Sequence, residues 1–140
     1  MAEGKLPTSI TLEVVTPEGL LFRDIVDEVI APGELGYFGV RPGHTPFLST
    51  LGAGEITYRQ GTVKKVLTCF WGFAEVLPDK VNILAELGER AEDIDLARAE
   101  AARDRAAAQL KEIKGEAGYE EAHVAYMRAV TRLAVARKQR

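Results

Sequence analysis

The sequence has almost none of the residues on which disulfides and metal sites depend. It contains one cysteine, Cys69, and two histidines, His44 and His123. A single cysteine cannot form a bridge within the chain, which fits a reducing compartment. The histidines lie far apart with no cysteine or histidine at ligand spacing, so we expect no metal site. We expect Cys69, next to Phe70, to be a buried small hydrophobe and not a nucleophile.

Clustered positive charge and long apolar runs are also missing. The chain has 18 Lys and Arg against 21 Asp and Glu, and this net charge of −3 argues against nucleic-acid binding. No apolar run approaches the ~18 residues of a membrane span, and the N-terminus has no stretch of the signal-peptide type. The sequence also lacks the nucleophile elbow, the phosphate-binding loop and the dinucleotide fingerprint. We therefore expect a soluble protein that is neither secreted nor an enzyme.

The residues that are present divide the chain near Gly88. All 6 prolines and all but two of the 13 glycines lie in residues 1–88, whereas residues 89–140 are rich in alanine and contain no proline. Turn residues thus dominate the first part, and strong helix formers dominate the second. This shift predicts two domains, 1–88 and 89–140.

The first part has the pattern of short strands. Apolar residues alternate with other residues over 10–15 and over 81–87, and residues 56–59 and 63–69 flank a turn at Gln60-Gly61. Turn signals recur about every 8–12 residues, which is typical of an antiparallel sandwich or barrel. The predicted fold class is α+β, with an N-terminal antiparallel β-sandwich or barrel followed by a C-terminal α-helical hairpin.

The second part predicts two helices separated by a break at 114–118. Their apolar stripes are Leu96, Ala99, Ala106, Leu110 and Ile113 in the first helix, and Tyr119, Ala122, Tyr126, Val130 and Leu133 in the second. A short glycine-containing linker favours an antiparallel hairpin. The stripes are rich in alanine and bury little area, so we expect a weakly held hairpin that docks and undocks.

Two loop segments carry a resemblance to a known family. Gly33-Glu34-Leu35-Gly36 is followed by Arg41-Pro42-Gly43-His44-Thr45-Pro46-Phe47-Leu48, in a strand-rich domain with a helical hairpin behind it. This layout resembles the epsilon subunit of bacterial F-type ATP synthases from about residue 8 to 138. The segment 37–40, between the two motifs, is longer than in many members of the family.

The resemblance implies a non-catalytic central-stalk subunit of a proton-translocating rotary ATP synthase. The sandwich would bind the gamma subunit and the c-ring loops, with Glu34 and His44 at the contacts, and so couple ring rotation to the catalytic head. It also implies a peripheral location on the cytoplasmic face of the bacterial inner (plasma) membrane. From the residues alone, His44 is equally well read as an exposed loop histidine.

A second family motif opens the first predicted helix as Ile94-Asp95-Leu96-Ala97-Arg98-Ala99. Further positions that match the family are Glu89, Arg105, Arg128 and Arg132. The resemblance links this set to a regulatory ATP site, with no cofactor required for function. Arginine suits phosphate because its guanidinium is a planar fork of donors. The alternative is a solvated surface of ion pairs. Arg128 and Arg132 are expected to project away from the apolar stripe of the second predicted helix, and this argues against the ATP site.

The resemblance also implies that the helical hairpin is a regulatory arm that extends into the head of alpha and beta subunits and inhibits ATP hydrolysis. Arg128, Arg132 and Arg137 are the basic residues that we expect to meet acidic loops there. The competing hypothesis is a free-standing adaptor, with a sandwich that binds a peptide or small ligand and a helical interaction arm.

Overall fold

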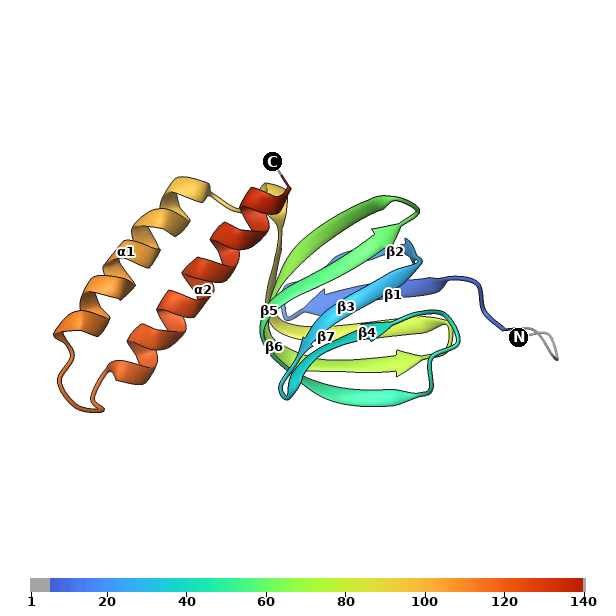
Figure 1. Ribbon diagram of the computed structural model, residues 1–140, viewed down its shortest axis with the longest axis horizontal. Coiled ribbons are helices and arrows are strands. Elements are labelled where there is room, and N and C mark those ends of the chain that lie inside the picture. Colours follow the sequence, from blue (N-terminus) through green and yellow to red (C-terminus); the bar gives the residue numbers. More distant parts are fainter. Residues whose placement is uncertain (1–5, 140) are drawn as a thin grey trace. The chain divides into compact units, whose positions relative to one another are not determined.

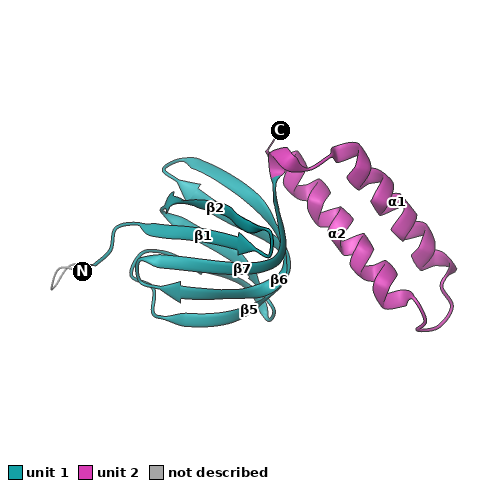
Figure 2. Ribbon diagram, turned by 180° about the vertical axis from the view of Figure 1, so that it is seen from behind, with its two compact units in different colours: residues 1–90 teal, residues 91–140 magenta. Residues whose placement is uncertain are grey.

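The computed structural model describes residues 6–139, and its contacts divide the chain into two compact units, residues 1–90 and 91–140 (Figure 2). This division falls two residues beyond the predicted one, because the last strand keeps pairing with its neighbour as far as Arg90, opposite Leu67. Among the described residues, no helix is long and apolar enough to cross a membrane.

Unit 1 is a seven-stranded sheet in the order β2-β1-β7-β6-β5-β3-β4 (Figure 1). The strands are β1 (Ile10–Thr16), β2 (Gly19–Val26), β3 (Glu28–Gly33), β4 (Gly36–Val40), β5 (Phe47–Gln60), β6 (Val63–Leu77) and β7 (Lys80–Arg90). All neighbours are antiparallel except β1 and β7, which run parallel. The predicted sandwich is confirmed, with this one parallel pair as the departure from an antiparallel sheet.

The sheet curls over one apolar core. Phe22 on β2 and Tyr58 on β5 are not sheet neighbours, yet their ring centroids lie 4.5 Å apart. The core is formed by the inward side of each alternating strand, which is why the predicted alternation over 10–15 and 81–87 is confirmed. Its fully buried side chains include Ile10, Leu12, Val14, Val29, Ile56, Val76, Val81 and Ile83.

A kink interrupts the middle of β6. Trp71 has a φ of 60°, and it falls outside the ladder on both sides, whereas its neighbours Phe70 and Gly72 pair with β5 and β7. A bulky residue in the left-handed region costs of the order of 1–3 kcal/mol and persists only where its surroundings hold it. Here the paired residues on either side hold the chain in this conformation.

Unit 2 is a helical hairpin, α1 (Leu96–Glu112) and α2 (Tyr119–Lys138), preceded by a short 3-10 turn at Ala91–Asp93 (Figure 1). The break between the helices lies where the sequence predicted it. The helices contact one another, and their buried positions include Ala99 and Ala106 on α1 and Ala122, Ala129, Leu133 and Ala136 on α2.

The predicted apolar stripe of α2 is partly wrong. Tyr119 is 47% exposed and Val130 is 39% exposed, whereas Arg128 and Arg132 are half-buried. The buried face of α2 consists mainly of alanines, because small side chains let two helices approach closely. The larger residues Tyr119 and Val130 lie outside this face. Arg128 and Arg132, which helical spacing places away from the predicted stripe, are thus not fully solvated.

Candidate functional site

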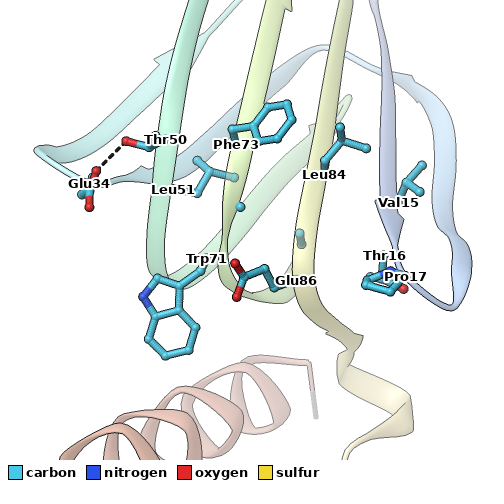
Figure 3. A pocket seen from close by; sticks show the side chains of 12 residues that line it. Val15, Thr16, Pro17, Glu34, Thr50, Leu51, Trp71, Phe73, Leu84 and Glu86 are labelled. Carbon is cyan, nitrogen blue, oxygen red and sulfur yellow. Dashed lines mark hydrogen bonds between the residues drawn. The ribbon is translucent and has the colours of Figure 1, made fainter. Parts of the chain in front are cut away.

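An apolar groove crosses the outer face of unit 1 (Figure 3). It consists of two neighbouring hollows of about 540 and 370 Å³, which share Val15, Phe73 and Leu84. Trp71 lines the first hollow and Leu48 lines the second. Phe73 is 45% exposed, Leu84 43% and Leu48 70%, so large apolar side chains face outward here.

Sheet register explains why these side chains gather. Thr50 on β5, Phe73 on β6, Leu84 on β7 and Val15 on β1 are direct partners, one strand after the next. Side chains directly opposite one another on neighbouring strands lie on the same face of the sheet. One row across four strands therefore carries three apolar side chains, and Figure 3 shows them along the same face. We name this row, Thr50-Phe73-Leu84-Val15, the apolar row.

The loops of the first family motif stand at the two ends of β4. Glu34 lies in the turn between β3 and β4, and His44 lies in the connection from β4 to β5. The five residues of β4 separate them by about 17 Å at the ~3.3 Å rise of a strand. The structure therefore does not bring these two predicted contact residues together.

The two loops are held by separate polar interactions. Thr50 Oγ1 donates to Glu34 Oε2 at 2.6 Å, and the Glu34 amide donates to the Thr50 carbonyl at 3.0 Å. In the other loop, Arg41 Nε lies 2.8 Å from Glu28 Oε2, and this guanidinium holds the pKa of Glu28 below its ordinary value. Glu34 is thus held beside the apolar row, whereas His44 lies beside the Arg41–Glu28 pair in a separate hollow.

The second motif marks the start of α1. Asp95 is the N-cap, and its Oδ1 accepts from the Arg98 amide at 3.1 Å. Ile94 and Ala99 are each 4% exposed. Three of the motif residues therefore have roles in the local fold, whereas the side chain of Arg98 is exposed.

The arginines of the motif occupy one flank of the hairpin. Each directly precedes a buried residue: Arg98 before Ala99, Arg105 before Ala106, Arg128 before Ala129, and Arg132 before Leu133. Glu100 and Arg137 each directly follow a buried alanine, and Arg137 Nη2 lies 3.5 Å from Glu100 Oε1. This ion pair marks the opposite flank of the hairpin. In an antiparallel pair of helices, the residues that directly precede contact residues lie on one side of the pair. The residues that directly follow contact residues lie on the other side. The four arginines therefore share one side, away from the Glu100–Arg137 pair.

Two predicted residues of the helical sites do not belong to this arginine flank. Glu89 belongs to β7 in unit 1, where the Thr68 hydroxyl lies 3.4 Å from its carboxylate. Arg137 is exposed on the opposite flank of unit 2 and paired with Glu100. The three residues expected to act in inhibition, Arg128, Arg132 and Arg137, thus lie on both flanks.

Comparisons with known proteins match both parts of the chain. Residues 9–91 match the family model described as the ATP synthase delta/epsilon chain beta-sandwich domain, and residues 92–137 match that of its long alpha-helix domain. A curated protein of Syntrophobacter fumaroxidans called ATP synthase epsilon chain is 50% identical, over 92% of this chain and 96% of its own length. The chain belongs to the ATP synthase delta/epsilon family.

Other members agree with this assignment. The ATP synthase epsilon chain 2 of Syntrophotalea carbinolica is 46% identical over 91% of this chain and 93% of its own length. A solved chain from the Euglena gracilis mitochondrial ATP synthase superposes with a TM-score of 0.78, covering 91% of this chain and 81% of its own. At 23% sequence identity, that likeness concerns the fold alone. The two curated relatives are both named as epsilon chains of an ATP synthase.

Within this family fold, the single cysteine and the groups that could bind a metal ion remain to be placed. Cys69 is fully buried, and burial raises the pKa of its thiol to about 12, so it is protonated and inert at neutral pH, as predicted. Between residues 6 and 139, no group of three or more His, Cys, Asp or Glu side chains is placed to hold a metal ion.

The apolar row was missed in the sequence, although the signal was present. In a strand with one solvated face the outward positions are usually polar, yet two of the six outward positions in 10–15 and 81–87 are apolar, Val15 and Leu84. Apolar residues at outward positions on more than one strand indicate a docking face. Only the register shows that Val15, Phe73 and Leu84 adjoin.

Replacing the N-cap tests the structural role of the second motif. We expect Asp95→Ala to destabilise α1 by about 1 kcal/mol, because the Arg98 amide loses its acceptor. Helical circular dichroism against temperature measures the loss. Asp93→Ala is the matched control, because Asp93 is exposed and precedes the cap. Equal melting of the two variants would show that the cap contributes nothing.

Proposed function

We propose that this chain acts as the non-catalytic epsilon subunit in the central stalk of a proton-translocating rotary ATP synthase. Family membership over both units supports the role. The observation that carries it is the apolar row, where the exposed side chains of Phe73 and Leu84 lie next to one another and to Val15 on neighbouring strands. Faces of this kind are typical of protein–protein contacts.

In this proposal, unit 1 holds the subunit in the rotor. The groove binds the gamma subunit, and the loops of Glu34 and His44 face the c-ring. A ring contact that uses both loops extends along the whole of β4, since the two loops lie at its ends. The chain would thus be peripheral to the membrane, on the cytoplasmic face of the bacterial inner membrane, through the complex.

Co-purification of the tagged chain from a membrane extract tests this assignment. We expect the wild-type chain to bring down the other synthase subunits. We expect Phe73→Ser with Leu84→Ser to lose them, because truncating central apolar contacts removes most of the binding energy of an interface. The matched control is Leu20→Ser with Ile25→Ser, a pair on β2 that is 59% and 61% exposed. Recovery of a clean wild-type monomer would instead favour the free-standing adaptor.

In unit 2, we propose that the arginine flank is a regulatory ATP site. Support comes from the position of Arg98, Arg105, Arg128 and Arg132 on one side of the hairpin. Guanidinium groups from both helices would bind the phosphates, and Asp95 would meet the adenine end. A ligand that bridges both helices favours the closed hairpin, because separated helices offer no equivalent site. No chemistry on the nucleotide is involved.

We further propose that unit 2 is the inhibitory arm of ATP hydrolysis. Changing Arg128, Arg132 and Arg137 to Glu should raise hydrolysis by the assembled synthase about threefold or more, because three ion pairs with the head, of ~0.2–1 kcal/mol each, are lost. Changing Arg103, Lys111 and Lys114 to Glu alters the net charge equally outside α2, and serves as the control. Unchanged hydrolysis in the first variant would count against electrostatic docking of the arm.

A further inference from the structure

The charged residues that line the groove of unit 1 are mainly carboxylates. Among the residues that line its two hollows are Glu13, Glu34, Glu75 and Glu86, against one cation, Lys80. Their formal charge of −3 equals the net charge of the entire chain. The remaining charges of the protein therefore balance, and the excess negative charge is concentrated at the groove.

Register places these carboxylates around the apolar row. Glu75 and Glu13 belong to the next outward row, both paired with Asn82 on β7. Glu86 follows Leu84 by two residues on β7 and so lies on the same face of the sheet. Glu34 lies beyond Thr50, at the end of the apolar row (Figure 3).

Two of the carboxylates are held by neutral partners. Thr50 donates its hydroxyl to Glu34 at 2.6 Å, and Asn82 Nδ2 donates to Glu75 Oε1 at 3.0 Å. These bonds restrict the side chains without cancelling their charge. Glu13 is the exception, since Arg23 Nε lies 3.6 Å from its Oε2. The groove thus has a rim of oriented negative charge around an apolar centre.

We propose that this groove recognises an apolar segment of its stalk partner that is flanked by lysine or arginine, and that the carboxylate rim steers the two together. The proposal rests on the proposed function and adds the chemistry of the partner. The apolar side chains of the partner lie against Phe73 and Leu84, and its cations face Glu75 and Glu86.

The charge of the rim decides against two other occupants. A second copy of this chain would bring the same carboxylates to the interface, and like charges in a contact are costly. An anionic membrane surface would be repelled for the same reason. A partner with basic flanks is attracted at distances up to the Debye length, about 8–10 Å at physiological salt.

Association kinetics at several salt concentrations test the steering. The full chain is immobilised, and synthase stripped of this subunit is the probe, measured by interferometry between low and high salt. We expect Glu75→Lys with Glu86→Lys to slow association at low salt by about tenfold or more, and to flatten its salt dependence. Dissociation should change little, because the apolar contacts remain.

The control carries the same change in net charge away from the groove. Asp104→Lys with Glu116→Lys alters exposed carboxylates of unit 2, and we expect its association rate to stay within about threefold of wild type. Equal rates and salt slopes for the two double variants would overturn the steering proposal while leaving the proposed function intact. Failure of the wild-type chain to bind stripped synthase would overturn both.

Discussion

Gly72→Ala should unfold unit 1 at a much lower temperature than wild type. Gly72 has a φ of +124°, and a Cβ placed there would collide with the backbone oxygen of Leu84 and lie 2.9 Å from the Ala85 Cα. Both contacts are backbone of the paired strand β7, which cannot retreat without breaking the ladder. We expect a loss of roughly 3 kcal/mol or more, hence a fall in Tm of about 10 °C or more.

Two other glycines separate the collision from the backbone strain. Gly39 lies in β4 without a positive φ and with no atom within 4 Å of an added Cβ, so Gly39→Ala should be nearly neutral. Gly61 has a φ of +61° and equally open space, so Gly61→Ala should cost about 1 kcal/mol from conformation alone. If Gly72→Ala and Gly61→Ala have the same Tm, the added Cβ at Gly72 does not collide with β7 and the proposed close approach of β6 and β7 is contradicted.

Arg98→Ala should weaken ATP binding by about 10-fold to 100-fold in titration calorimetry on the full chain. A hydrogen bond to a charged group contributes ~1.5–3 kcal/mol, and the exposed Arg98 side chain has no role in the cap, which uses only its backbone amide. Arg98→Lys should restore part of the affinity, because lysine keeps the charge and loses the planar fork.

Arg137→Ala is the matched control for the arginine flank. It removes the same charge from the same hairpin, but on the side of the Glu100–Arg137 pair. We expect it to bind ATP as wild type does. Absence of heat at millimolar ATP, or equal affinity of wild type and Arg98→Ala, would remove the nucleotide site from the proposed function.

In the helical unit, the sequence predicted the positions of the helices but not the whole buried face of α2. The two helices and the break between them follow from local preferences: Asp95 caps α1, and the backbone turns at Gly115 and Gly118, both of positive φ. The predicted buried face of α2 was partly wrong: Ala122 and Leu133 are buried as predicted, whereas the larger residues Tyr119 and Val130 are exposed. Close approach favours alanine at the contact, so Val130 stays exposed.

For the candidate sites too, the sequence identified residues but not their arrangement in space. The arginines of the hairpin could be found in sequence, since a motif and helical spacing identify them, but their common flank depends on how the helices pair. Glu34 and His44 were both expected at the contacts with the c-ring and gamma subunit, and they lie at the two ends of β4. They are only ten positions apart in the chain, yet a strand between two turns separates them.

The sequence by itself determined the two-part architecture, the strand and helix composition and the burial of Cys69, because turn residues, alternation and helix propensity act over a few neighbouring residues. Only the tertiary structure decided that Thr50, Phe73, Leu84 and Val15 form one row, that carboxylates surround it, and that β1 runs parallel to β7. Strand register and pairing order depend on contacts between residues far apart in the chain, and the pattern of any single segment does not contain them.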